Sequence, residues 1–202
     1  MPEMIDEAGQ IESTTVIIYR TAATVKGGRR FSFGARVGVG DRQGKVGYGY
    51  AKSNEVPQAI EKAQRKARRN MVTVKRLGTT VPHEVETRFS ASKIRLIPAT
   101  PGTGIVAGAT VRAVLEMAGY SDCITKRLGS GNKLNVVKAT IDGLAKMRLL
   151  EEVAERRGVE LEASVIEQRI ERAKALTGAG IGASSEPAAA GDEGDADPAT
   201  DN

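Results

Sequence analysis

Residues 25–50 read VKGGRRFSFGARVGVGDRQGKVGYGY, and the spacing of their apolar side chains decides the fold. Gly27 and Gly28 separate two β-prone segments, and such a pair predicts a hairpin because primed turns need positive φ at their central residues. From 31 to 39, every second residue is apolar, with Ser, Gly and Arg between. This alternation predicts a strand with one buried face. After a second turn at 41–44, the alternation resumes over 46–50 and predicts another strand.

Outward from this stretch lie a further strand and a helix. Residues 16–19 are β-prone and predict a short first strand. Pro57 opens a predicted helix that runs to about Met71, because a proline in the first turn loses no hydrogen bond. The apolar stripe of this helix is expected to comprise Val56, Ile60, Ala63 and Ala67.

A second unit follows, with strands and helices alternating. Residues 92–98 predict a strand, 109–118 a helix, and 122–127 a strand that buries Cys123. Asn135 is expected to cap the next helix, which runs to about Met147. Together the two units predict an α+β fold. Its parts are an acidic arm at 1–13, a first domain at 14–78, a linker at 79–91, a second domain at 92–160, a helix at 161–176 and a disordered acidic tail at 177–202.

Charge is distributed unevenly along the chain. The formal net charge is +5, but residues 20–76 carry 15 Lys and Arg against three acidic residues. Both ends are acidic: residues 1–14 carry four acids and residues 175–202 carry six, with no Lys or Arg in either segment. A dense field of one sign favours a polyanionic partner, and nucleic acid is the expected one.

Two clusters are the candidate RNA contacts. The predicted helix places Lys62, Lys66 and Arg69 on one face, and only Glu61 is available to pair with its cations. At the hairpin tip, cations flank two residues without side chains, so the backbone can approach a phosphate. The alternative for both clusters is an ordinary solvated surface. The full predicted RNA-binding set is Lys26, Gly27, Gly28, Arg29, Arg30, Lys52, Lys62, Arg65, Lys66, Arg68 and Arg69.

Catalytic and metal chemistry have little support in the sequence. Residues 102–107 match a dinucleotide fingerprint with Asp122 about twenty residues on, but a tight turn into a packed helix explains the pattern as well. His83 is the only histidine and Cys123 the only cysteine, so they cannot supply a metal site between them. No disulfide, cofactor or membrane span is expected, since no apolar run approaches ~20 residues.

Several ordered motifs resemble one family, the bacterial small-subunit ribosomal protein five. The similarity covers about residues 12–160. The segments that carry it are TVKGGRRFSF at 24–33, VGD at 39–41, GKVGYGY at 44–50, VPQAI at 56–60, KARRNM at 66–71, PA at 98–99, GTGIVAG at 102–108, RAVLE at 112–116 and NVVKAT at 135–140.

This resemblance implies a fold and a set of partners. The first domain should resemble a double-stranded RNA-binding module without its first helix. The second should be a two-layer α/β sandwich with a left-handed β-α-β crossover, against the usual hand. The family has no enzymatic activity, acts in the cytoplasm within the 30S subunit, and binds 16S rRNA near the neck and decoding region. Its hairpin reaches the rRNA beside the spectinomycin pocket.

The resemblance also implies protein contacts. The second domain should meet small-subunit proteins four and eight, with protein three nearby. Gly104 and Arg112 fall on the motifs that face protein four, where the family influences decoding accuracy. The family also supports subunit assembly and lines the mRNA entry path. Ala23 stands where many members have Lys, Lys133 stands where Pro is common, and the acidic tail matches no known motif.

Two other functions stay open at this point. One is a free regulatory protein that binds double-stranded RNA, which cofractionation with 30S particles would separate from the ribosomal reading. The other is a nucleotide-dependent enzyme that uses the Gly102 loop, which titration with NAD or ATP would test. The sequence favours a structural RNA-binding protein over both.

Overall fold

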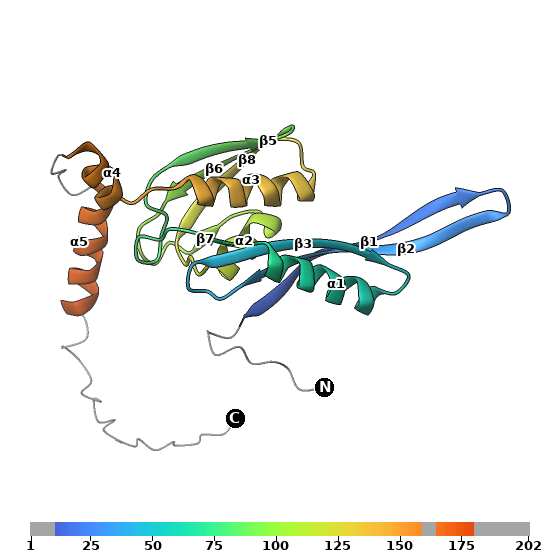
Figure 1. Cartoon of the computed structure of the whole chain (residues 1–202). Coiled ribbons are helices and arrows are strands. Elements are labelled where there is room, and N and C mark those ends of the chain that lie inside the picture. Colours follow the sequence, from blue (N-terminus) through green and yellow to red (C-terminus); the bar gives the residue numbers. More distant parts are fainter. Residues whose placement is uncertain (1–10, 159–164, 180–202) are drawn as a thin grey trace, which may run out of the picture.

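A computed structural model describes residues 11–158 and 165–179 of the chain. Within these residues, two four-stranded sheets and five helices form an α+β fold (Figure 1). The first sheet has the order β1-β2-β3-β4 and is antiparallel throughout. Its strands are β1 (Glu12–Val25), β2 (Gly28–Gly40), β3 (Lys45–Ser53) and β4 (Met71–Thr73), with α1 (Val56–Arg69) between the last two.

The second sheet has the order β5-β6-β8-β7, in which only β7 and β8 run parallel. Helix α2 connects these two strands, so the chain contains the β-α-β unit that was expected. Its left-handed sense stays a prediction. The elements of this part are β5 (Val85–Phe89), β6 (Ser92–Pro98), β7 (Ile105–Val106), α2 (Ala109–Ala118), β8 (Cys123–Gly129), α3 (Lys133–Lys146), α4 (Leu150–Arg157) and α5 (Val165–Ala179).

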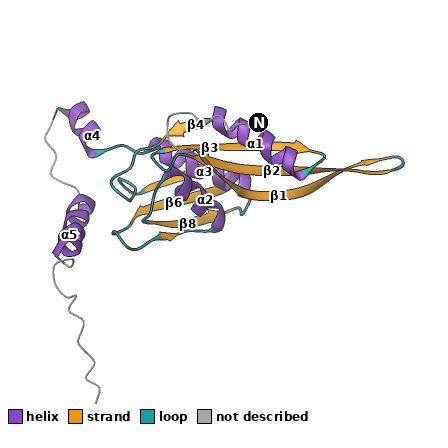
Figure 2. Cartoon of the chain, turned by 90° about the horizontal axis from the view of Figure 1, so that it is seen from below, coloured by secondary structure: helices purple, strands orange, loops and turns teal. Residues whose placement is uncertain are grey.

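Away from the exposed hairpin, both faces of the first sheet are covered, contrary to the half-buried strand that alternation predicts. Helix α1 packs on the face of Ala35, Val37 and Val39, and α2 contacts the opposite side of β1, β2 and β3 (Figure 2). That opposite side of β2 consists largely of glycine. A Cβ on Gly40 would lie 2.0 Å from the Met117 carbonyl oxygen, so glycine lets α2 sit directly on the strand. The Gly40 end of this face is therefore an interdomain contact, whereas a Cβ on Gly34 would meet Tyr19 of β1.

The stripe of α1 differs from the expected one. Its buried residues are Ala59, Ala63 and Ala67, while Val56 and Ile60 are only partly buried. The reason is the facing strand: a Cβ on Gly49 would lie 1.9 Å from the Ala63 carbonyl oxygen. Strand and helix approach so closely that only the smallest side chains fit between them.

The two domains share one core. Val46 of β3 and Val74 pack with Leu96, Leu115 and other residues of the second unit. Hydrogen bonds reinforce this seam, since the Arg42 amide donates to the Met117 carbonyl at 3.1 Å. The first domain is thus held against the second by apolar packing as well as by the chain connection.

Several predicted boundaries are wrong. The first strand begins at Glu12, inside the predicted arm, and a fourth strand begins at Met71. Residues 79–91 are not only a linker, because Val85–Phe89 form β5, a strand of five residues. Asn132, not Asn135, caps α3, and its Oδ1 accepts the Leu134 amide at 3.1 Å.

The hairpin turn and the C-terminal part also differ from the prediction. The turn is Lys26–Gly27, since Val25 pairs with Gly28, and positive φ occurs at Gly28 rather than within the turn. Helix α4 was not predicted. The last predicted helix, at 161–176, matches α5 from Val165 onward. Most of the predicted arm and tail lies outside the described residues.

Candidate nucleic-acid interface

A basic cleft lies between α1 and the open edge of β3. Strand β4 pairs only with Lys45–Gly47, so within residues 11–158 and 165–179 the rest of β3 has no strand partner on that side. The cleft has a volume of about 240 Å³. Its lining residues are Ala51, Lys52, Lys62, Arg65, Lys66 and Arg69. Five of the eleven predicted RNA-binding residues therefore line one cleft, while Arg68 is exposed on α1 outside its lining.

Few acidic side chains neutralise the cations of this cleft. Among the ion pairs of the described residues, the only one that involves a cleft cation joins Arg65 to Glu61 at 2.5 Å. Both side chains are mostly exposed, so this pair is weak. Lys52, Lys62, Lys66 and Arg69 keep their positive field available for an anion.

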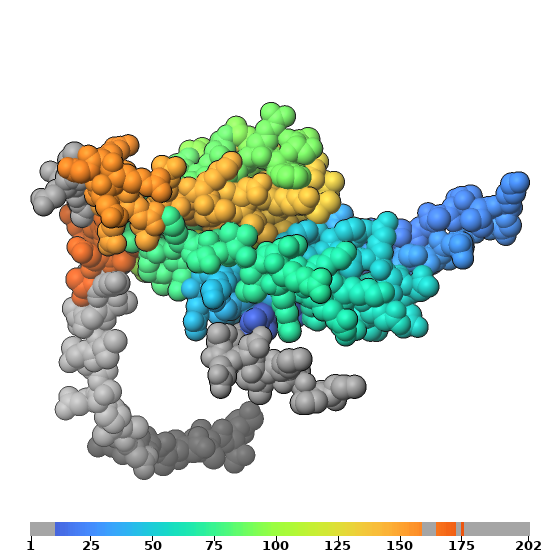
Figure 3. Space-filling view, viewed as in Figure 1, coloured from blue at the N-terminus to red at the C-terminus, as the bar shows by residue number. Residues whose placement is uncertain are grey.

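The hairpin projects away from the body of the molecule as a two-stranded ribbon (Figures 1 and 3). All of Lys26 to Arg30 is exposed. Along the hairpin, Arg30 and Lys52 line a second hollow of about 630 Å³ together with Phe31 and polar or small residues. The two hollows adjoin at Lys52, which lines both, and we call the cations of the hairpin and of the two hollows the basic track. They are Lys26, Arg29, Arg30, Lys52, Lys62, Arg65, Lys66 and Arg69.

The structure adds residues that the sequence did not single out. The Arg20 guanidinium lies 4.1 Å from the ring centroid of Phe31, which is 46% exposed on the hairpin. Their contact depends on strand register, since Arg20 pairs with Phe33 and Phe31 with Ala22 across β1 and β2. The signal in the sequence was an aromatic residue within a basic segment, a combination typical of nucleic-acid surfaces.

A second aromatic cluster holds Arg36. Its guanidinium lies 5.0 Å from the Tyr19 ring and 5.9 Å from the Tyr50 ring. The two tyrosine rings are nearly parallel, with centroids 6.3 Å apart. Beside them, burial raises the pKa of the Tyr48 phenol to about 12. This cluster stiffens the sheet behind the track through cation–π contacts.

Two family models match the chain over adjacent segments. The N-terminal domain of ribosomal protein S5 matches residues 11–75, and the C-terminal domain of ribosomal protein S5 matches residues 87–157. The chain belongs to the ribosomal protein S5 family. Its role is therefore that of a structural, rRNA-binding protein of the ribosome, which acts in translation. No helix in the described part of this S5 chain is long and apolar enough to cross a membrane.

The dinucleotide-like loop of this S5 chain is organised around its own acid. Asp122 is buried, and its Oδ1 accepts the Gly104 amide at 2.9 Å. The carboxylate that a ribose would need is thus engaged within the loop. In addition, the fingerprint requires a loop that opens a helix, whereas this loop leads into β7. The tight-turn explanation fits this geometry better than nucleotide binding.

The two candidate protein-contact residues of the S5 chain lie together. Gly104 has φ +75°, and the exposed Arg112 donates from Nη2 to the Ile105 carbonyl at 3.0 Å. Arg112 therefore braces the turn that Gly104 forms. The pair defines one corner of the second domain, at the start of β7 and α2.

The remaining candidate residues of the S5 chain have structural contacts. His83 Nε2 lies 3.2 Å from the Arg148 amide, which donates to it, and Nδ1 lies 3.0 Å from the Glu84 carbonyl. Cys123 is fully buried, its thiol lies 3.6 Å from the Ile97 carbonyl, and burial raises its pKa to about 11. Among the described residues, no three His, Cys, Asp or Glu side chains converge as metal ligands would.

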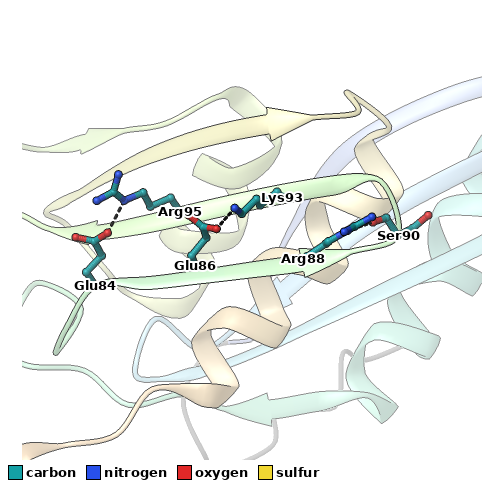
Figure 4. Close-up of polar contacts among 6 residues, drawn as sticks. All are labelled: Glu84, Glu86, Arg88, Ser90, Lys93 and Arg95. Carbon is teal, nitrogen blue, oxygen red and sulfur yellow. Dashed lines mark hydrogen bonds and ion pairs between the residues drawn. The ribbon is translucent and has the colours of Figure 1, made fainter.

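The second sheet of this S5 chain shows the opposite charge pattern to the track. On β5 and β6, Glu84 pairs with Arg95 and Glu86 with Lys93 (Figure 4). Arg88 donates from Nε to the Ser90 carbonyl at 2.9 Å. Among the described residues, Lys93 and Arg95 of β6 thus have acidic partners, whereas most cations of the hairpin and α1 do not. This contrast favours the track as the place for an external anion.

Proposed function

We propose that this chain is a scaffold of the bacterial small ribosomal subunit that binds 16S rRNA near the neck and decoding region through the basic track. The main support for this proposal is that the hollow along the hairpin and the cleft at α1 adjoin at Lys52, which lines both. Membership in the S5 family supports a ribosomal site of action. In this proposal the protein supports subunit assembly and decoding accuracy and lines the mRNA entry path in the cytoplasm.

Recognition in this proposal depends on phosphate charge and RNA shape. Lys and Arg of the track neutralise phosphates and release counterions, which gives affinity without reading bases. The hairpin could enter a groove of the RNA, because its tip is exposed and a Cβ added at Gly27 would lie more than 4 Å from any described heavy atom outside Gly27 and its two chain neighbours. Helix α1 supports a broader contact across a groove of a folded RNA.

The protein partners in this proposal are small-subunit proteins four and eight, with protein three nearby. The corner formed by Gly104 and Arg112 is proposed as the contact with protein four. The Arg112–Ile105 hydrogen bond supports this assignment, since it presents the corner in a defined shape. Loss of this brace is expected to weaken the protein contact and leave rRNA binding unchanged.

A double substitution in the hairpin tests the RNA assignment. Lys26→Ala with Arg29→Ala is expected to weaken binding to a 16S rRNA fragment, because two phosphate contacts are lost. Each contact contributes about 0.9 to the slope of log K against log salt, so the slope should flatten by about 1.8. The slope is measured by titration at several salt concentrations.

A matched control removes two cations from the second domain. Lys133→Ala with Lys146→Ala changes the net charge equally, at exposed positions at the two ends of α3. This variant should keep the original slope. An unchanged slope in the hairpin variant, or an equal change in the control, contradicts the assignment.

A further inference from the structure

The acidic segment at 186–201 and the basic cleft carry complementary charge. Residues 180–202 hold six acids and no Lys or Arg. They are Glu186, Asp192, Glu193, Asp195, Asp197 and Asp201. Five of these acids fall within ten residues, a density of negative charge comparable to that of a short polyanion.

Among the described residues, the five cations of the cleft have a single acid as an ion-pair partner. These cations are Lys52, Lys62, Arg65, Lys66 and Arg69, and within the described chain Glu61 is the one acid paired with any of them. On β6, by contrast, Lys93 and Arg95 are paired with Glu86 and Glu84. An acidic segment of the same chain therefore finds its best electrostatic partner at the cleft rather than at β5 and β6.

The segment is long enough to reach the cleft. From Ala179, at the end of α5, the chain continues for 22 residues to Asp201. An extended chain of this length spans up to roughly 75 Å. A folded body of this size is on the order of 40 Å across. Attachment to the same chain also gives the segment an effective concentration of about a millimolar.

We propose that the acidic segment at 186–201 binds the basic cleft in the free protein and competes there with RNA. A non-specific RNA that binds weakly is then excluded from the cleft by the segment, whereas the specific rRNA binds tightly enough to displace it. The contact itself needs no RNA, but its role as a competitor rests on the proposed RNA binding. Because the contact joins acidic side chains to exposed Lys and Arg side chains of the cleft, it should weaken as salt rises.

Carbodiimide crosslinking of the full chain tests the contact directly. This reagent joins a carboxylate to a nearby amine, and mass spectrometry identifies the joined residues. At low salt and high dilution, tail acids should crosslink to Lys52, Lys62 and Lys66, and 0.5 M salt should abolish these products. The lysines Lys126, Lys133 and Lys146 of the second domain serve as the internal control. Crosslinks that favour these control lysines, or that are spread evenly over all lysines, overturn the proposal.

A variant with a neutral tail tests the competition. The six acids are replaced by their amides, as in Glu186→Gln and Asp192→Asn, so that chain length is unchanged. Non-specific double-stranded RNA should then bind roughly three- to tenfold more tightly at low salt, which corresponds to a cleft that is 70–90% occupied by the native segment. At 0.5 M salt the two proteins should bind equally. Equal binding at low salt overturns the competition.

These two experiments separate the inference from the proposed function. The crosslinking contains no RNA, so its outcome does not depend on whether the track binds rRNA. The hairpin variant described above retains both the cleft and the tail, and its salt slope tests rRNA binding alone.

Discussion

At the scale of single residues, glycine decides how closely α1 approaches the sheet. Gly49→Ala would place a Cβ 1.9 Å from the Ala63 carbonyl oxygen and 2.7 Å from the Ala67 amide nitrogen. Backbone atoms cannot yield as a flexible side chain can, so α1 must move. We expect the free energy of unfolding to fall by about 1–3 kcal/mol, the usual cost of overpacking. Urea denaturation measures this loss.

Gly27→Ala, in the turn between β1 and β2, is the matched glycine control. A Cβ there meets nothing within 4 Å, and Gly27 has no positive φ. Its effect should stay within about 0.5 kcal/mol, as for other exposed positions. Equal losses in the two variants would show that the close approach of α1 to β3 is not what Gly49 provides.

A buried thiol and a half-buried phenol give the protein a pH-dependent stability. Burial raises the pKa of the Cys123 thiol from 9.0 to about 11 and that of the Tyr48 phenol from 10.0 to about 12. The unfolded chain therefore loses these protons at lower pH than the folded one. Their contribution is complete below pH 9 and is lost as pH rises through about 11 and 12.

Thermal unfolding checks this behaviour. The midpoint temperature should fall between pH 9 and 12, and Tyr48→Phe should make the fall shallower above pH 10, because one of the titrating groups is gone. Tyr48→Phe also removes a buried hydroxyl that has no hydrogen-bond partner among the described residues, so its midpoint at pH 7 should not drop. A pH profile parallel to that of the original protein would contradict the role of Tyr48.

At the scale of elements, local patterns predict most strands and helices, but not which face meets which partner. The spacing of Lys62, Lys66 and Arg69 predicts their common face, because 3.6-residue periodicity is a local property. The position of Lys52 beside them depends on the packing of α1 along β3, which no local pattern encodes. Six of the predicted RNA-binding residues lie on the hairpin or on α1 outside the cleft, and their roles stay predictions.

Two features of the fold were missed for different physical reasons. Strand β5 is only five residues long, and Thr87 interrupts the face that it shares with Val85 and Phe89, so its alternation is a weak signal. On β2 and β3, glycines lie against α1 or α2, where a hydrophobic pattern would mark them as exposed. Glycine that permits a close approach carries no hydrophobic signal, and the interdomain seam was missed for this reason.

Arg76 joins two elements across that seam. Its Nη1 donates to the Arg42 carbonyl at 3.2 Å and to the Gly119 carbonyl, at the end of α2, at 2.9 Å. Arg76→Met should lower the free energy of unfolding by about 1–3 kcal/mol, because two carbonyl groups lose a charged donor. Urea denaturation with probes in both domains measures the effect.

Arg42→Met provides the comparison for Arg76. It breaks only an exposed ion pair with Glu12 and leaves the Arg42 backbone carbonyl in place. Such pairs contribute up to about 1 kcal/mol. If Arg76→Met were no more harmful than Arg42→Met, the guanidinium of Arg76 would not be a significant link between the domains.

At the scale of the whole molecule, charge and packing are divided between the domains. The second domain provides most of the shared core and pairs the cations of β6 with acids of β5. The first domain contributes a small core of alanine and valine and holds its cations along the hairpin and α1. This division fits a scaffold in which the first domain binds RNA and the second domain holds the first in place.

Protein–RNA crosslinking within assembled 30S particles, with the joined residues mapped on both partners, tests this division most directly. We expect crosslinks to 16S rRNA from the hairpin at Lys26 and from the cleft at Lys52, Lys62 and Lys66, with few from Lys93 on the second sheet. Crosslinks that concentrate on the second sheet and leave the hairpin and α1 unmodified would contradict it.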